Sequence, residues 1–81
     1  MKTIRFCGHK NIIHTRLIQA REAQLLSQQQ LAAKLQLLEV SIDQQAISKI
    51  ELDKRIVTDY ELMCLCKVLH VKAAWLMGDL D

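Results

Sequence analysis

Two short motifs with the same spacing constrain the fold of this chain more than any other feature. Ser27 stands three residues before Gln30, and Thr58 stands three residues before Glu61. In such a capping box the hydroxyl oxygen accepts a hydrogen bond from the N–H of the third helical residue, whose side chain accepts one from the capping residue's own N–H. Apolar residues at helical spacing follow each motif. The motifs predict that one helix begins after Ser27 and another after Thr58.

Apolar spacing predicts further helices on both sides of these two. One covers residues 11–23 with Asn11 as its N-cap, another begins at residue 44, and a short one over residues 73–77 ends at Gly78. We therefore expect five helices around one core. The residues predicted to form that core are Ile13, Leu17 and Ala20; Leu31, Leu35 and Leu38; Val40 and Ile42; Ile47 and Ile50; and Leu62, Leu65, Cys66 and Leu69.

The composition agrees with helices and limits the size of the core. The 81 residues include no proline and two glycines, and a chain of this length has room for one small domain. We expect an all-α bundle formed by residues 11–81, preceded by an N-terminal arm or tail at residues 1–10. The net charge of +2 neither demands nor excludes a nucleic-acid partner, because affinity for phosphates depends on where the basic groups lie.

The helix that begins at residue 44 has two chemically different faces. Asp43 is its predicted N-cap, and Ile47 and Ile50 fall on one side. The other side carries groups able to read DNA, because a glutamine amide can pair with an adenine edge and a lysine with a guanine edge or a phosphate. An amphipathic helix with a solvated polar face is the alternative interpretation. The polar residues are Gln44, Gln45, Ser48 and Lys49.

No metal site, cofactor site or catalytic centre is predicted. The number of cysteines is odd, and the pairs Cys7/His9 and Cys64/Cys66 lack the spacing of a structural zinc site. We interpret the cysteines as reduced thiols that pack as small hydrophobes. The histidines also lack the spacing of ligands or nucleophiles, so we expect surface or turn residues. They are His9, His14 and His70.

Neither a membrane span nor a secretory signal is visible. No apolar run approaches the roughly 18 residues that a transmembrane helix needs, and the N-terminus has no apolar segment followed by a small-residue cleavage site. The sequence therefore predicts a protein with no membrane partner that stays in the reducing cytoplasm.

Many spaced positions between residues 11 and 78 follow a known order. They are Arg16-Leu17, Arg21, Leu26-Ser27-Gln28, Leu31-Ala32, Leu35, Ile47-Ser48-Lys49-Ile50-Glu51, Lys54-Arg55, Glu61-Leu62 and Leu69-x-Val71. In this order the chain resembles the Cro/C1-type (XRE) family of helix-turn-helix repressors, which are bacterial or phage-encoded. The resemblance implies a lambda-repressor-like bundle whose second and third helices form the helix-turn-helix. It also implies a homodimer that represses transcription by binding double-stranded operator DNA, with the third helix in the major groove.

The same resemblance implies roles for individual side chains. Base edges would be contacted from the third helix by Gln44, Gln45, Ser48 and Lys49. DNA phosphates would be contacted by Gln28, Lys54, Arg55 and, as a weaker candidate, Arg16. A structural ion pair that holds the third helix in place would join Arg21 to Glu51.

The chain departs from the family pattern at four turns, where glycine is usual. The residues found there are Leu25, Glu39, Asp53 and His70. Leucine and glutamate enter the left-handed region of backbone conformation at a cost, so the connections at Leu25 and Glu39 are expected to be reshaped.

A longer connection is the other departure. The segment from Leu35 to Ile47 exceeds the common family form by about five residues, and we expect an extra turn of the preceding helix to absorb most of them, with Leu38 on the core face.

A protein-binding role is the alternative function. The chain could be an antitoxin that neutralises a partner protein, or the fold could bind protein only. The polar face of residues 44–49, with Lys54 and Arg55 nearby in sequence, favours DNA. For Trp75 two interpretations stay open, a dimer contact or packing against the first helix, because large aromatics serve both purposes.

Overall fold

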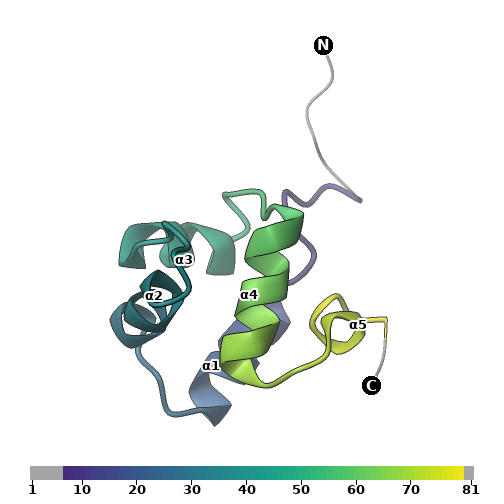
Figure 1. Cartoon of the computed structure of the whole chain (residues 1–81). Helices are drawn as coiled ribbons and strands as arrows, with labels where there is room; N and C mark the ends of the chain where they lie inside the picture. Colours follow the sequence, from purple (N-terminus) through teal and green to yellow (C-terminus); the bar gives the residue numbers. More distant parts are fainter. Residues whose placement is uncertain (1–6, 80–81) are drawn as a thin grey trace.

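The computed structural model describes residues 7–79, and this part of the chain contains five α-helices (Figure 1). They are α1 (His14–Ala23), α2 (Gln28–Gln36), α3 (Gln44–Glu51), α4 (Asp59–Leu69) and α5 (Ala73–Leu76). The predicted all-α bundle of five helices is confirmed. Residues 1–6 of the predicted arm lie outside the described residues.

Three helices begin at the caps that the sequence predicts. The Ser27 hydroxyl accepts the N–H of Gln30 at 3.0 Å, and the Gln30 side chain accepts the N–H of Ser27 at 2.8 Å. Thr58 and Glu61 make the same pair of hydrogen bonds at the start of α4. Asp43 caps α3 by accepting the N–H three residues further on, at 2.8 Å. These bonds satisfy N–H groups that the first helical turn leaves without partners.

All five described helices end in the same kind of turn. After each helix one residue has a positive φ, between 57° and 82°, and the N–H of the next residue donates to the carbonyl oxygen five residues back. This is the Schellman motif. The left-handed residues are Leu25, Glu39, Asp53, His70 and Gly78.

The turns at Leu25 and Glu39 are therefore not reshaped, contrary to expectation. The N–H groups of Leu26 and Val40 complete the Schellman bonds, each at 3.1 Å. Val40 is buried and Leu26 is packed against the core. An apolar residue at this position commonly accompanies the motif, and its burial offsets the strain of the preceding left-handed residue.

The core contains side chains from every helix and from the α2–α3 connection. Its buried apolar members are Ile13, Leu17, Ala20, Leu31, Ala32, Leu35, Val40, Ile42, Ile47, Ile50, Cys64, Leu65, Leu69 and Leu76. Leu62 and Cys66, also predicted for the core, are partly buried against it. Within residues 7–79, no helix is both long enough and apolar enough to span a bilayer.

Leu38 does not extend the apolar stripe of α2, so that prediction is wrong. The α-helix ends at Gln36, and the Leu38 residue is 44% exposed. Most of the additional residues lie in the turn and extended segment between α2 and α3, where Val40 and Ile42 are buried in place of Leu38.

Asn11 is not the N-cap of α1, which begins after Ile13 without a side-chain cap. Asn11 is buried and donates from Nδ2 to the carbonyl oxygens of Ile50 at 3.0 Å and Arg55 at 2.9 Å. Its Oδ1 accepts the N–H of Ile13 at 3.2 Å. A buried amide needs such partners, and here they tie the segment before α1 to the end of α3 and the following loop.

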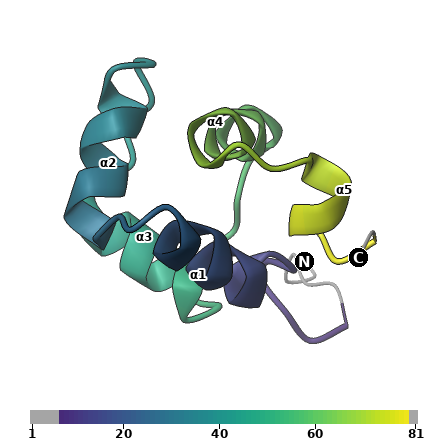
Figure 2. The same ribbon diagram turned by 90° about the horizontal axis from the view of Figure 1, so that it is seen from below.

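The helices are arranged so that α2 and α3 lie together on one side of the molecule (Figures 1 and 2). α2 contacts α3 and α4, α1 contacts α3 and α5, and α4 contacts α5. In both views α5 lies on the side away from α2. The two consecutive helices α2 and α3 therefore share one outer surface.

Candidate nucleic-acid interface

The α3 helix separates an apolar face from a polar one, as its sequence predicts. Ile47 and Ile50 are fully buried. Because residues three and four apart share a face of a helix, the residues between them point away from the core. This outward face carries Gln44, Gln45 and Lys49, which are exposed, and Ser48, which is half-buried.

Side chains of α2 and α3 line one shallow depression of about 400 Å³. Its lining residues are Gln28, Gln44, Gln45, Ser48 and Lys49. Gln28 is the first residue of α2, and Gln44 is the first residue of α3, so two helix N-termini border the depression. Amide, hydroxyl and ammonium groups at such a place can donate to base edges and to phosphate oxygens.

Glu51, the last residue of α3, joins three helices. Its carboxylate accepts Nε of Arg21 at 2.7 Å, Nη2 of Arg21 at 3.2 Å and Nε2 of Gln28 at 2.9 Å. The ion pair predicted between Arg21 and Glu51 is thus present, with side chains that are 14% and 5% exposed. The hydrogen bond with Glu51 raises the pKa of Arg21 above its usual value. A third donor bond, from Arg21 Nη1 to the Leu26 carbonyl at 2.9 Å, fixes the α1–α2 connection as well.

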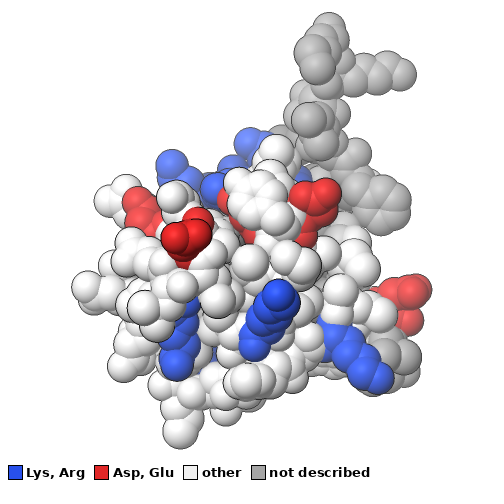
Figure 3. Space-filling view, viewed as in Figure 1, with Lys and Arg blue, Asp and Glu red and all other residues white. Residues whose placement is uncertain are grey.

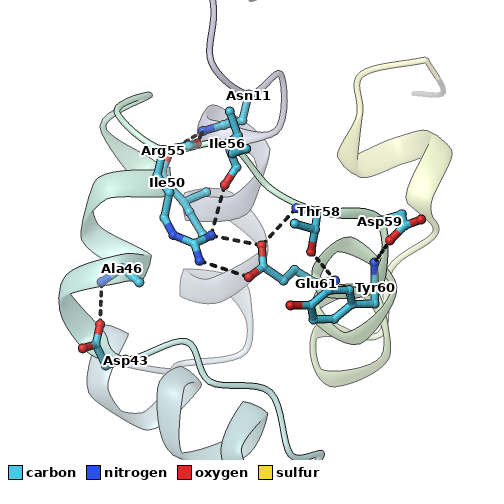
Figure 4. A network of polar contacts seen from close by, with 10 residues as sticks. All are labelled: Asn11, Asp43, Ala46, Ile50, Arg55, Ile56, Thr58, Asp59, Tyr60 and Glu61. Carbon is cyan, nitrogen blue, oxygen red and sulfur yellow. Dashed lines mark hydrogen bonds and ion pairs between the residues drawn. The ribbon is translucent and has the colours of Figure 1, made fainter. Parts of the chain in front are cut away.

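Arg55 lies in the loop after α3 and reaches towards α4 (Figure 4). Its guanidinium donates to both carboxylate oxygens of Glu61, each at 3.0 Å, and to the carbonyl of Ile56. Burial alone would raise the pKa of Glu61, but the hydrogen bonds from Arg55 and Thr58 outweigh it and lower that pKa. Arg55, predicted to contact phosphate, is therefore engaged within the fold by two of its nitrogens.

The other two predicted phosphate contacts differ in their surroundings. Lys54 is exposed in the loop that follows α3. Arg16 instead donates from Nη1 to the Trp75 carbonyl at 2.8 Å, and its guanidinium carbon lies 4.8 Å from the centre of the Trp75 ring. Arg16 is not among the residues that line the depression, and the α5 helix that carries Trp75 lies on the side away from α2. Trp75 packs against α1 through this contact.

Charged side chains of both signs are mixed on the face of the molecule that Figure 3 draws. On this face, basic side chains lie singly or next to acidic ones, and no large uniform basic patch forms. The arrangement of hydrogen-bonding groups around α3 is therefore more informative than net charge.

One polar cluster of the structure has no counterpart in the sequence analysis. Asp53 follows α3 and accepts the N–H groups of Lys10 at 2.9 Å and Asn11 at 3.1 Å. Its other carboxylate oxygen lies 2.7 Å from Nδ1 of His9, whose ring is 5.2 Å from that of His14. The hydrogen bond with His9, with those from Asn11 and Lys10, lowers the pKa of Asp53 to about 2. Separation in sequence concealed this cluster, because His9 and Asp53 are 44 residues apart.

Comparison with known proteins gives one result. A family model described as helix-turn-helix matches residues 17–76, which is most of the chain and includes all of α2, α3, α4 and α5. No match was found among curated proteins or among solved structures. The matched segment contains the helix pair and the depression described above, so the chain belongs to the Cro/C1-type (XRE) family of helix-turn-helix DNA-binding regulators.

Proposed function

We propose that this protein is a sequence-specific transcriptional repressor that binds operator DNA as a homodimer, with α3 in the major groove. One observation carries the proposal: Gln28 and the four outward residues of α3 line a single depression. The polar face of α3, considered alone, would also fit an amphipathic helix whose polar side is only solvated. The convergence of α3 with the N-terminus of α2 fits the docking of a helix-turn-helix, where one helix meets base edges and the other meets the backbone.

Base reading is assigned to the outward face of α3. Gln44 and Gln45 begin the helix, and a glutamine amide can accept a hydrogen bond from N6 of adenine while it donates one to N7 of the same base. Lys49 lies about a turn further along and suits a guanine edge. Ser48, half-buried between them, can add a single hydrogen bond.

Phosphate contacts are assigned to Gln28 and Lys54. Gln28 starts α2, whose N-terminus carries the positive end of the helix dipole. Its amide nitrogen donates to Glu51, which orients the side chain beside the depression. Arg55 can add a phosphate contact through the N–H groups that Glu61 leaves unused, whereas Arg16 is assigned to the support of α5.

Binding-site selection from a random duplex library tests the proposal. Selected half-sites should contain an A·T pair that depends on Gln44 or Gln45. The Gln44→Ala variant should bind the preferred site about 1–3 kcal/mol more weakly and lose preference at one base pair. Gln19→Ala is the matched control, because Gln19 is an exposed glutamine of α1 outside the depression. If Gln44→Ala, Gln45→Ala and Lys49→Ala all select the wild-type consensus with full preference, residues 44–49 do not read DNA.

Protein binding is the second candidate function, and one surface supports it. Leu37 and Leu38 are 84% and 44% exposed and line a groove with Val68. Exposed apolar groups of this kind often mark protein contacts. A chain that selects no DNA sequence but retains its fold would favour this role over the repressor.

A further inference from the structure

Three potential metal ligands from three separate segments meet beside the end of α3. His9 precedes α1, His14 is the first residue of α1, and Asp53 is the left-handed residue after α3. One ligand atom from each lies within 4.8 Å of the other two. Two imidazoles and one carboxylate form a donor set that suits borderline divalent ions such as Zn²⁺, Ni²⁺ and Co²⁺.

The carboxylate is held in position before any ligand binds. Asp53 Oδ1 accepts the N–H groups of Lys10 and Asn11, which leaves Oδ2 directed at Nδ1 of His9. The Schellman turn fixes the Asp53 backbone, since the N–H of Lys54 donates to the Lys49 carbonyl at 2.7 Å. Hydrogen bonds that orient a ligating carboxylate are typical of metal sites.

The site is also open to solvent. The side chains of His9 and Asp53 are 45% and 20% exposed, so an ion can enter without opening the core. In a tetrahedral zinc site, bonds of about 2.0–2.2 Å place ligand atoms ~3.4 Å apart. His9 Nδ1 and Asp53 Oδ2 are 2.7 Å apart, and the three ligand atoms all lie within 4.8 Å of one another, a range that includes this value.

We propose that His9, His14 and Asp53 form a binding site for a divalent transition-metal ion, with Zn²⁺ as the principal candidate and water completing the coordination. The ion takes the place of the proton between Nδ1 of His9 and Oδ2 of Asp53. A neutral His9 then carries its one proton on Nε2, and a protonated His9 releases one proton to solvent when the ion binds. No redox change is involved. Calcium and magnesium are disfavoured, because they select oxygen ligands. The ion would join the segment before α1, α1 itself and the α3–α4 loop.

Zinc titration of the full-length chain, first treated with chelator, tests the site. Isothermal titration calorimetry should give one Zn²⁺ per chain, and Zn²⁺ should raise the thermal midpoint because it binds the folded chain preferentially. Replacing Zn²⁺ by Co²⁺ should give the visible absorption of a low-symmetry, four-coordinate ion. Absence of saturable Zn²⁺ binding would overturn the proposal.

Variants distinguish this site from other ligands on the chain. Asp53→Asn keeps a residue that tolerates the left-handed conformation, and His14→Gln keeps a polar residue at the start of α1. Each should weaken Zn²⁺ binding at least tenfold and remove the thermal shift, while circular dichroism in chelator shows a folded chain. His70→Asn and Cys7→Ser are matched controls, and both should bind as the wild type does.

Two outcomes contradict the proposal even where zinc binds. One is equal affinity in the wild type, Asp53→Asn and His14→Gln. The other is loss of binding in Cys7→Ser with retention in His14→Gln, which would assign the ion to the Cys7/His9 pair. Should Asp53→Asn fail to fold, His14→Gln and His9→Gln decide the matter, because neither residue has a left-handed backbone.

Discussion

Leu25 and Glu39 hold left-handed conformations, with φ of 58° and 61°, that a side chain with a Cβ atom makes unfavourable. The cost is about 1–2 kcal/mol per residue. Leu25 is 89% exposed, so packing of its side chain contributes little to stability and does not offset this cost. The conformation is imposed from outside the residue, by the Schellman hydrogen bond and by burial of the apolar residue that follows.

Glycine at position 25 should therefore stabilise the protein. We expect Leu25→Gly to raise the free energy of unfolding by about 1 kcal/mol, measured by urea denaturation. Leu37→Gly is a matched control, because Leu37 is 84% exposed but has a right-handed φ of −64°. That substitution should lower stability by about 0.5–1 kcal/mol. Equal effects of the two substitutions would show that the backbone strain at Leu25 is negligible.

Side-chain roles were predicted from sequence with uneven success, for physical reasons. The polar face of α3 follows from helical periodicity, which is local. Asn11 was predicted to be an N-cap because it directly precedes a helical apolar pattern. Its amide instead donates to the carbonyl groups of Ile50 and Arg55, about 40 residues away in sequence. The cluster around Asp53 depends on the same long-range packing, and no spacing rule along the chain could indicate it.

At the scale of helices, Glu51 couples the position of α3 to α1 and α2. Removing one member of a buried ion pair leaves the other charge without compensation. We expect Arg21→Met and Glu51→Gln each to lower the free energy of unfolding by about 3 kcal/mol. Glu22→Gln, next to Arg21 but exposed, should change it by less than about 0.5 kcal/mol. A double-mutant cycle with no coupling between positions 21 and 51 would contradict this role.

The start of α4 should be sensitive to acid through Glu61. Its pKa is lowered in the fold, so the carboxylate contributes stability above the unfolded value, about 4.3 for glutamate, and this contribution is lost as pH falls through the lower folded value. Glu61→Gln keeps the capping box but loses the charged partner of Arg55. It should be less stable than the wild type by about 1.5–3 kcal/mol at pH 7.

Urea denaturation at pH 7, 5 and 3 checks this expectation. The difference between the wild type and Glu61→Gln should persist from pH 7 to pH 5 and narrow at pH 3. A difference that stays constant down to pH 3 would mean that the ionisation of Glu61 is not involved.

The beginnings of α2 and α4 were predictable because each is marked by a capping box, which is contained within four residues. The end of α2 could not be predicted in this way. Leu38 continues the apolar period of that helix, but the Val40 N–H bonds to the Leu35 carbonyl, which ends the helix early and buries Val40 instead. Tertiary packing decides whether Leu38 or Val40 enters the core. The apolar period of the sequence carries no information about that packing.

For the whole molecule, size bears on the proposed dimer. The longest extent is 35 Å, close to the ~34–36 Å between half-sites one helical turn apart. Each copy carries one α3 helix and can therefore read one half-site, so a two-fold operator needs two copies. Sedimentation of the complex with a selected duplex should show two chains per site. One chain per site would leave DNA reading by α3 intact but remove the dimer from the proposal.

The electrostatic part of DNA binding should depend on Lys54. Its side chain is exposed in the loop that follows α3 and does not line the depression, so the proposed interface uses it for phosphate and not for bases. Lys54→Ala should weaken binding to specific and non-specific duplexes by the same factor. It should also reduce the slope of log affinity against log salt by about 0.9 for each phosphate that Lys54 neutralises.

Lys67→Ala removes an equal charge from the exposed side of α4, away from the depression, and should leave the slope nearly unchanged. A salt slope that falls equally in both variants would indicate a general effect of net charge, whereas weaker binding to one sequence alone would make Lys54 a base reader.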